Sequence, residues 1–295
     1  MALIPYDDRD GWIWFDGRFV PWREAKIHVL THGLHYASAV FEGERMYAGD
    51  IFRLSEHTRR LFRSAEILDF EIPYTLAEID QACKDTCARN GFEDCYVRPI
   101  AWRGSEVMGV AAEDSTIHVA IAVWSWPSYF DPQQKARGIH LTWAKYRRPS
   151  PETAPTESKA AGLYMICTIS KHAAERDGFA DALMLDWRGY VAEATGANVF
   201  FVRDGVLHTP IPDCFLDGIT RRSVMEIARA RGFEIEERHI RPEELATFSE
   251  CFIVGTAAEV TPVAQVGEYR FTPGAISLSL MDDYAGSVRR QRQPA

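Results

Sequence analysis

Short apolar runs separated by turn residues fill the start of the chain. Residues 12–20 place two aromatic or β-branched runs around an Asp-Gly pair, and residues 40–47 and 51–54 lie on either side of an Ala-Gly-Asp turn. Apolar runs around such turns are typical of antiparallel strand pairs. We therefore predict two strand–turn–strand units at the start of the chain.

The pattern then changes to a helical period. Apolar side chains recur along one seam over residues 56–68, and a second such segment, 76–90, ends before a glycine, so both are predicted to be helices. Strands are predicted at 96–102 and 117–126, where aromatic and β-branched residues are frequent. The N-terminal part is therefore expected to be an α/β unit with a mainly antiparallel sheet.

A polar segment with proline and glycine at residues 131–138 has the composition of an interdomain connection. We predict a small N-terminal α/β domain over residues 1–130, this linker, and a large C-terminal domain over residues 139–295. Two domains suit a chain of 295 residues. In the C-terminal part the predicted strands are 139–143, 182–185, 198–202, 206–209 and 250–254, and the predicted helices are 160–177 and 220–231.

Composition and charge limit the partners. With 46% hydrophobic and 12% aromatic residues the chain can bury a sizeable core. The net charge of −9 argues against a nucleic-acid partner, because binding to phosphates needs basic surface. The acidic N-terminus does not resemble a signal peptide, and no apolar run approaches the about 18 residues of a membrane span. We therefore expect a cytoplasmic protein that binds no membrane, with its six cysteines as buried free thiols.

The first candidate for chemistry is a lysine with a glutamate further along. Lys159 lies among small residues at the predicted start of a helix, where the helix dipole disfavours a cation. Glu193 follows between two predicted strands, and Tyr164 could reach the same cavity as the lysine. A pyridoxal phosphate (PLP) enzyme needs an amine that bonds to the cofactor aldehyde and an acid that keeps the pyridine nitrogen protonated. Taken alone, Lys159 could equally be a solvated surface lysine and Glu193 a turn carboxylate.

Two small-residue turns are predicted to offer unpaired backbone N–H groups. One opens a predicted helix and the other follows a predicted strand. A helix N-terminus attracts phosphate because its first N–H groups have no partner within the helix. The first turn could also be an ordinary N-cap. The turns are Gly218-Ile219-Thr220 and Gly255-Thr256-Ala257.

His28, His32 and His35 have the spacing of a metal-binding helix face. We reject a metal site there, because the aliphatic residues between them predict a strand and no carboxylate or cysteine completes the ligand set. There is also no Gly-x-Gly-x-x-Gly after a predicted strand and no Walker lysine, so dinucleotide- and nucleotide-binding folds lose their usual support. No metal is expected.

Three consecutive motifs run from the glutamate to the first small-residue turn: Glu193-x-Thr195-x-x-Asn198-Val-Phe200, Leu207-His-Thr209 and Leu216-Asp-Gly218-Ile219-Thr220-Arg221. With this spacing they resemble the diagnostic stretch of the class IV (fold type IV) PLP aminotransferases, most closely the branched-chain amino acid aminotransferases. Further matches spread over nearly the whole chain, at 32–36, 41–45, 56–61, 96–99, 108–110 and 255–262.

The resemblance implies an α/β fold of α+β type in two domains, of which the larger binds PLP and has a mixed, barrel-like sheet. It also implies a homodimer or higher homo-oligomer, because Tyr36 and Val110 in this family reach the site of the neighbouring subunit. Glu44 departs from the family pattern, which usually has an aliphatic residue at this position. The alternation of a strand would turn it away from the site.

The resemblance also implies a role for each cofactor residue. Lys159 would bond to PLP and carry the proton, Glu193 would pair with the pyridine nitrogen, and Tyr164 with the ring hydroxyl. Arg60 and the two small-residue turns would hold the phosphate. The helical pattern agrees with this choice, since it places Arg60 beside the apolar seam and the neighbouring arginines on the opposite side.

For the substrate, the resemblance places the α-carboxylate at Tyr96 and the Thr256-Ala257 turn. Arg98 lies two residues from Tyr96 and so on the same strand face. We hypothesise that Arg98, together with Tyr129 and the partner subunit's Tyr36, binds the distal carboxylate of glutamate and 2-oxoglutarate. The implied substrate residues are Tyr36, Phe41, Arg45, Tyr96, Arg98, Val110, Trp126, Tyr129, Thr256 and Ala257, with Tyr164 adding to the apolar wall.

The activity implied by the resemblance is transamination between L-leucine, L-isoleucine or L-valine and 2-oxoglutarate. The Tyr96-x-Arg98 pair and the Met108-Gly-Val110 turn favour this type. The alternatives within the class are a D-amino acid aminotransferase, an amine transaminase and an aminodeoxychorismate lyase. A PLP-binding homologue without turnover is a further alternative, against which the intact Lys159 argues.

Overall fold

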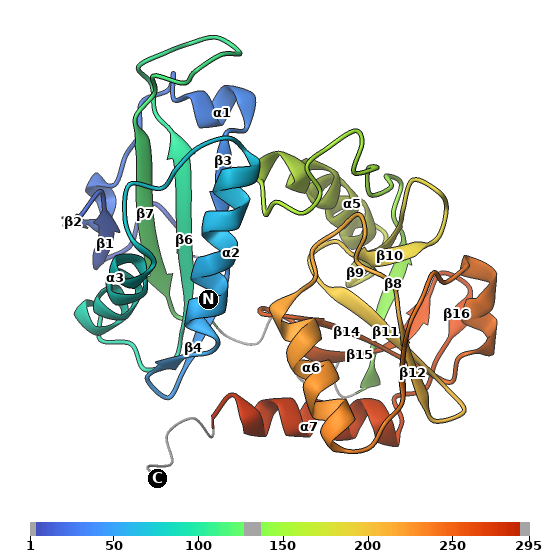
Figure 1. Ribbon diagram of the computed structural model, residues 1–295. Helices are drawn as coiled ribbons and strands as arrows, with labels where there is room; N and C mark the ends of the chain where they lie inside the picture. The colour runs from blue at the N-terminus through green and yellow to red at the C-terminus, as the bar shows by residue number, and fades with distance from the viewer. Residues whose placement is uncertain (1–3, 127–136, 290–295) are drawn as a thin grey trace. The chain divides into compact units, whose positions relative to one another are not determined.

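The computed structural model describes residues 4–126 and 137–289 (Figure 1). The chain divides into two compact units. Unit 1 extends to Trp126 and also contains Ser158–Gly162, whereas unit 2 comprises the rest of the chain. Most of the expected linker at 131–138 lies outside the described residues.

The short segment that carries Lys159 groups with unit 1 rather than with the C-terminal part, where we expected it. The amide of Phe41 donates a 3.2 Å hydrogen bond to the carbonyl of Lys159. Val40 also forms an isolated antiparallel β-bridge with Ala160. Backbone pairing of this kind cannot be read from the local sequence, because the partners are far apart along the chain.

Unit 1 is built on a seven-stranded antiparallel sheet in the order β2-β1-β7-β6-β4-β5, with β3 also paired to β6. Helices α2 (Leu54–Ile67) and α3 (Leu76–Arg89) pack against this sheet (Figure 1). Its strands are β1 (Trp12–Phe15), β2 (Arg18–Pro21), β3 (Ala39–Phe41), β4 (Glu44–Tyr47), β5 (Asp50–Ile51), β6 (Cys95–Arg103) and β7 (Ile117–Trp124).

Both helices predicted for this unit are confirmed. The side chains of Leu61 and Ala65 on α2 are buried in the core, as the seam predicted. The start of α3 is fixed by a capping box: Thr75 Oγ1 accepts a hydrogen bond from the amide of Glu78 at 3.2 Å, and the carboxylate of Glu78 accepts one from the amide of Thr75 at 2.7 Å. This pairing satisfies amides that the helix itself leaves open.

The strand expected in the histidine-containing segment is wrong. Residues 25–31 are irregular and lead into a short helix, α1 (His32–Tyr36). The aliphatic side chains that indicated a strand are exposed on the surface rather than paired in a sheet. His32 binds through Nε2 to the carbonyl of Gly109 at 2.8 Å, which ties α1 to the loop between β6 and β7.

Unit 2 is built on a nine-stranded mixed sheet in the order β10-β9-β8-β15-β14-β11-β12-β13, with β16 paired to β15. An additional pairing between β10 and β11 closes six of these strands into a barrel, which confirms the expected barrel-like sheet. The strands are β8 (Ile139–Trp143), β9 (Asp181–Leu185), β10 (Val191–Ala194), β11 (Asn198–Arg203), β12 (Val206–Thr209), β13 (Ile235–Glu237), β14 (Glu250–Gly255), β15 (Glu259–Val266) and β16 (Tyr269–Arg270).

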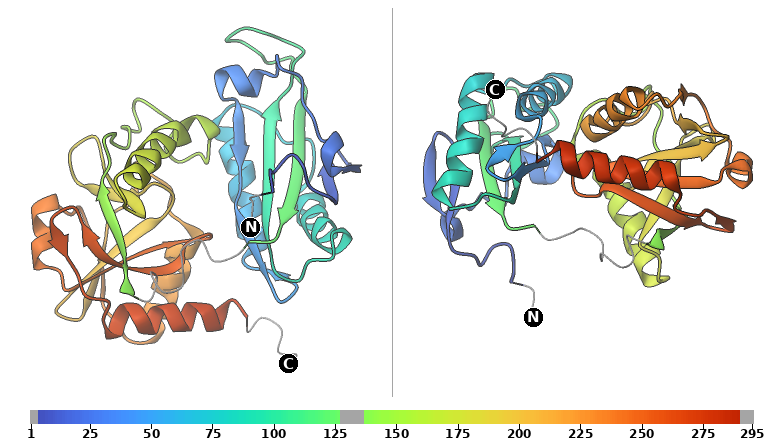
Figure 2. Two further views of the ribbon diagram at one scale, coloured as in Figure 1. Left: turned by 180° about the vertical axis from the view of Figure 1, so that it is seen from behind. Right: turned by 90° about the horizontal axis from the view of Figure 1, so that it is seen from below.

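The helical elements are more numerous than predicted. The helix expected at 160–177 is a 3-10 turn followed by an α-helix, and α7 was not predicted. Figure 2 shows α7 running beside α6. The remaining helical elements are η1 (Trp22–Glu24), η2 (Ala161–Tyr164), α5 (Met165–Arg176), α6 (Ile219–Ala230), η3 (Pro242–Thr247) and α7 (Ala275–Ser287).

The state of the cysteines and the apolar length of the helices were both considered in the sequence analysis. All six cysteines are free and buried, as predicted. No helix within residues 4–126 and 137–289 is long and apolar enough to cross a membrane.

Candidate active site

The backbone of Lys159 and the side chain of the preceding Ser158 both bind Ser64 on helix α2. The amide of Lys159 donates to Ser64 Oγ at 2.9 Å, and Ser158 Oγ donates to the carbonyl of Ser64 at 2.9 Å. The Nζ of Lys159 lies 5.2 Å from the centroid of the Phe41 ring. The expectation that Lys159 begins an α-helix is wrong, because α5 begins only at Met165, after the 3-10 turn.

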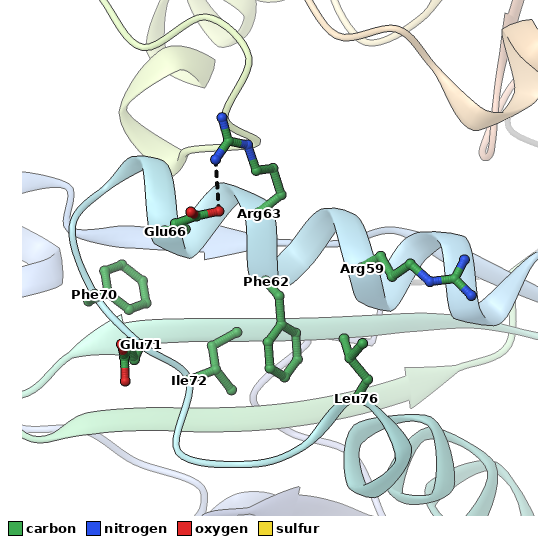
Figure 3. Close-up of a pocket in the computed structure, with 8 residues that line it drawn as sticks. All are labelled: Arg59, Phe62, Arg63, Glu66, Phe70, Glu71, Ile72 and Leu76. Carbon is green, nitrogen blue, oxygen red and sulfur yellow. Dashed lines mark hydrogen bonds and ion pairs between the residues drawn. The ribbon is translucent and has the colours of Figure 1, made fainter.

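Arg60 occupies the face of α2 that the sequence predicted. Its Nε and Nη2 donate to the two carboxylate oxygens of Glu42, at 2.6 and 2.8 Å. Arg59 and Arg63 are exposed on the outer side of the helix, where they border a hollow of about 460 Å³ that none of the predicted site residues lines (Figure 3). The sequence analysis did not single out Glu42, the partner of Arg60.

The expected substrate residues of unit 1 gather around β6. Arg98 Nη2 donates to the hydroxyl of Tyr96 at 3.1 Å, which confirms that the two side chains share a strand face. The guanidinium carbon of Arg98 lies 4.8 Å from the Phe41 ring centroid, and the rings of Tyr96 and Trp126 are also 4.8 Å apart. Because Phe41 also lies beside the Lys159 amine, unit 1 brings these five side chains into one neighbourhood.

The other substrate residues predicted for this unit are not among the five side chains of that neighbourhood. Arg45 lies opposite Tyr96 in the β4–β6 register. Tyr36 and Val110 are exposed, with 45% and 87% of their surfaces accessible. Tyr129 lies outside the described residues.

Glu44 is fully buried in β4, and neither of its carboxyl oxygens has a hydrogen-bond partner within the part of the chain that the structure describes. Burial, followed by the charges of Glu42 and Asp80, raises the pKa of Glu44 well above its usual value. Glu44 pairs with Val97 in the register, one position away from Arg45. Strand alternation therefore turns it away from the candidate residues.

Glu193 lies within β10, not in the turn that the sequence indicated. Barrel closure pairs it with Asn198, whose Nδ2 donates to Glu193 Oε2 at 3.2 Å. Arg148 lies on its other side, with Nε 3.5 Å from Oε1. Burial lowers the pKa of Arg148, but the charge of Glu193 raises it and the net change is upward. Cys167 and Tyr164 are among the further groups that raise the pKa of Arg148.

Arg148 is a residue that sequence reasoning missed. It is 4% exposed, whereas its neighbour Arg147 is exposed. The two adjacent arginines lie in an irregular, proline-rich loop, and no periodicity distinguishes them. The burial of Arg148 and its contact with Glu193 show that this arginine is the one that points inward.

Asn198 also connects Glu193 to the start of α6. Its Nδ2 donates to the carbonyl of Leu216 at 3.1 Å. A Cβ atom on Gly218 would lie 2.2 Å from Asn198 Oδ1, so only glycine permits this close approach. No side chain caps α6, so the N–H groups of its first turn are suited to an anion.

The second small-residue turn lies in the same unit. Gly255 ends β14, and a Cβ atom on it would lie 3.3 Å from the carbonyl oxygen of Gly196. The turn at 255–257 therefore lies beside the turn that precedes Asn198. Unit 2 thus brings together Glu193, the start of α6 and this second turn, as the sequence predicted.

The donors of both units fit PLP. Unit 1 offers an amine, which reacts with an aldehyde, and a guanidinium, which binds phosphate. Unit 2 offers a carboxylate suited to a protonated pyridine nitrogen, and a helix N-terminus suited to phosphate. Among residues 4–126 and 137–289, one cluster has the donor set of a metal site, made of Asp186, Asp213 and Cys214. Arg188 already binds both of its carboxylates, at 2.6 and 2.8 Å.

The model of the class IV amino-transferases matches residues 39–266 of the chain. This match covers most of the sequence and includes Arg60, Lys159 and Glu193. The chain belongs to the class IV aminotransferase family.

Individual relatives have a more specific name. The chain is 42% identical over 294 residues to a probable branched-chain-amino-acid aminotransferase of Rickettsia conorii, covering 98% of this chain and 100% of the relative. It is 42% identical over 263 residues to the branched-chain-amino-acid aminotransferase of Pseudomonas aeruginosa, covering 88% and 86% of the two chains.

The structure is similar to that of the branched-chain aminotransferase from Thermoproteus uzoniensis with norvaline, with a TM-score of 0.91, 36% identity and 95% of each chain covered. The branched-chain amino acid aminotransferase from Thermobaculum terrenum in its PLP form matches with a TM-score of 0.86 and 32% identity, covering 95% of this chain and 94% of that one. The fold type IV architecture expected from the sequence is thereby confirmed.

Proposed function

We propose that the protein is a PLP-dependent transaminase that transfers the amino group between branched-chain L-amino acids and 2-oxoglutarate, giving branched 2-oxo acids and L-glutamate. The observation that carries the proposal is the placement of Glu193 beside the uncapped start of α6 in a member of this family. A carboxylate at that point suits the ring nitrogen of a cofactor whose phosphate binds the helix. The relatives support the substrate class through their names.

When bound, PLP supplies an aldehyde carbon that accepts an amine and a cationic ring that stabilises negative charge at the substrate α-carbon. Lys159 Nζ is the amine that would hold the cofactor and would give up this position to the substrate amine. The freed Lys159 amine would then carry the proton that leaves the substrate α-carbon. Glu193 keeps the proton at the pyridine nitrogen, and Tyr164 hydrogen-bonds the ring hydroxyl.

The phosphate is held by one side chain and two backbone turns in this proposal. Arg60 provides a charge-assisted contact, and Ile219 and Thr220 provide N–H groups at the start of α6. Gly218 allows the helix to begin at that point. Gly255 and Thr256 complete the site from the second turn.

Substrate binding divides between polar and apolar groups. Tyr96 and the Thr256-Ala257 turn bind the α-carboxylate, and Arg98 binds the distal carboxylate of glutamate. The remaining substrate residues in the proposal are Phe41, Arg45, Trp126 and Tyr129, with Tyr36 and Val110 acting on the site of the neighbouring subunit. One pocket would thus accept an aliphatic side chain in one half-reaction and a carboxylate in the other.

We further propose a homodimer as the smallest active unit. Four large apolar side chains are exposed in two segments of the chain: Leu34 and Tyr36 in one, Met108 and Val110 in the other. The hydrogen bond between His32 and Gly109 brings these two segments together. An exposed apolar patch of this kind is typical of a protein interface. The six free thiols fit a reducing compartment such as the cytoplasm.

A spectral scan tests the function. The PLP-loaded protein is mixed with leucine, isoleucine and valine in L and D forms, with L-glutamate, and with a primary amine. The L-amino acids should bleach the band of the lysine-bound cofactor and yield 2-oxo acids when 2-oxoglutarate is present. Reaction with D-amino acids or the amine alone would identify a different class IV enzyme, and no reaction at all would identify a non-catalytic homologue.

A further inference from the structure

Glu42 is a buried carboxylate with four hydrogen-bond contacts to N–H groups. Its side chain is fully inaccessible to solvent. Oε1 accepts from Arg60 Nε at 2.6 Å, and Oε2 accepts from Arg60 Nη2 at 2.8 Å, His57 Nδ1 at 2.7 Å and the amide of Gly43 at 3.2 Å. An ionised carboxylate acts only as a hydrogen-bond acceptor. All four contacts of Glu42 are to nitrogen atoms, which suits the ionised form.

The charges around Glu42 agree with this assignment. Burial alone would raise the pKa of Glu42, but the charges of Arg60 and then His57 outweigh it, so the pKa lies well below the usual value. Burial lowers the pKa of His57 against the opposing charge of Glu42, and its Nδ1 lies 2.7 Å from Glu42 Oε2. Arg60 is then the cation that compensates the Glu42 carboxylate.

The bidentate contact fixes the orientation of Arg60 before any ligand is present. An arginine side chain held at one oxygen could still rotate, whereas two parallel N–H···O bonds define the plane of the guanidinium. Immobilising a free arginine on binding would weaken affinity by a factor of about 10 to 30 through lost rotamer entropy. In this protein Glu42 has already removed that freedom.

The backbone of Glu42 is held as firmly as its side chain. Its amide donates to the carbonyl of Pro99 at 2.9 Å, and the preceding amide, of Phe41, donates to the carbonyl of Lys159. The same two-residue segment therefore anchors the lysine through its backbone and the arginine through its side chain. The Phe41-Glu42 segment therefore connects Lys159 with Arg60.

We propose that Glu42 is a positioning residue that orients Arg60 for a phosphate-bearing ligand without contacting the ligand itself. This role rests on the proposed function, in which Arg60 binds the PLP phosphate. It makes Glu42 important for affinity towards the phosphate in particular, rather than for the fold in general.

The test compares two ligands that differ only in the phosphate. Full-length protein freed of cofactor is titrated with PLP and with pyridoxal, which lacks the phosphate. Glu42→Gln should weaken PLP binding about 10- to 30-fold, because Arg60 is released and loses its charged acceptor, and should leave pyridoxal binding unchanged. Glu66→Gln is the matched control, since Glu66 binds Arg63 at 2.7 Å on the exposed side of the same helix, and it should change neither affinity.

A double-mutant cycle shows whether Glu42 acts through Arg60. In an Arg60→Met background, Glu42→Gln should cause no further loss of PLP affinity. If Glu42→Gln alone does not fold, the PLP affinity of Arg60→Met is compared with that of the double variant that carries both Arg60→Met and Glu42→Gln. This comparison still shows whether Glu42 acts through Arg60. Glu42→Asp, which keeps the charge but shortens the side chain, should show a smaller loss that is again confined to PLP.

Several results would overturn the inference. Coulomb's law alone predicts that removing a negative charge near Arg60 strengthens phosphate binding, so tighter PLP binding by Glu42→Gln would assign Glu42 the role of a counter-charge. Equal losses for PLP and pyridoxal would indicate a purely structural role, and additive losses in the cycle would show that Glu42 does not act through Arg60. If the unaltered protein does not bind PLP, the proposed function itself fails.

Discussion

Replacing Glu44 with valine should stabilise the protein, and the gain should increase with pH. The carboxyl group is fully buried without a hydrogen-bond partner among the described residues. Valine has a branched side chain that suits the interior of strand β4 and carries no polar atom. The substitution therefore removes an unsatisfied polar group from the core of unit 1.

The expected gain in the free energy of unfolding has two parts. Removing a buried polar group that lacks a partner gains about 1–3 kcal/mol. The second part depends on pH because the pKa of Glu44 is raised in the folded protein. The unfolded chain releases this proton above about pH 4.3, whereas the folded protein retains it, so stability falls as pH rises from there to the folded pKa. In that window the loss is about 1.4 kcal/mol per pH unit, and Glu44→Val abolishes it.

The assay is urea unfolding between pH 5 and pH 8 at a fixed excess of PLP. Glu44→Gln is a second variant that cannot titrate but still buries an amide, so it should remove only the pH-dependent part of the difference. Glu66→Gln, at an exposed position, is the control. The reasoning is refuted if the difference in stability between the unaltered protein and Glu44→Val is independent of pH, or if Glu44→Val is the less stable of the two.

Four further predictions concern the candidate site. Lys159→Ala should bind PLP but lose at least ~10³-fold in turnover, and borohydride reduction of the unaltered protein should label no other lysine. Arg60→Ala should weaken PLP binding roughly 10- to 150-fold, whereas Arg59→Ala should do little; equal titration curves would contradict this. Glu193→Gln should reduce turnover at saturating PLP far more than it reduces affinity, and unchanged turnover would remove the residue from the mechanism. Arg98→Leu should slow the half-reaction with L-glutamate by roughly 2–3 kcal/mol and that with L-leucine much less, as measured by single-turnover bleaching; parallel losses would assign Arg98 to the α-carboxylate or to the fold.

Local patterns were sufficient to predict much of the fold. The apolar seam of α2 is a pattern of residues only a few positions apart, and so are the turn residues on either side of the helix. The helix, and the face of it that carries Arg60, could therefore be predicted. The same holds for the shared face of Tyr96 and Arg98, since a strand alternates strictly. The strand predicted before His32 was wrong because a short run of aliphatic residues has the same sequence pattern in a buried strand and in an exposed irregular segment.

Contacts between distant segments could not be predicted in this way. Glu193 belongs to strand β10, which pairs with β9 and β11, and Arg148 is buried beside Glu193. The role of Glu42 depends on a helix that begins after two further strands. In each case the deciding partner is separated by a turn or by a whole element, and no spacing in the sequence encodes it.

The closed barrel has a consequence for a chain that is still being synthesised. Strand β8 lies between β9, which follows soon after it, and β15, which begins only at Glu259. The sheet of unit 1, in contrast, is complete once Trp124 has emerged. A nascent chain therefore assembles its first sheet early, while the second keeps β8 as an open edge until almost all of the protein has left the ribosome. Such an edge can pair with another chain, so chains that terminate before β15 should aggregate through unit 2 even though unit 1 has folded.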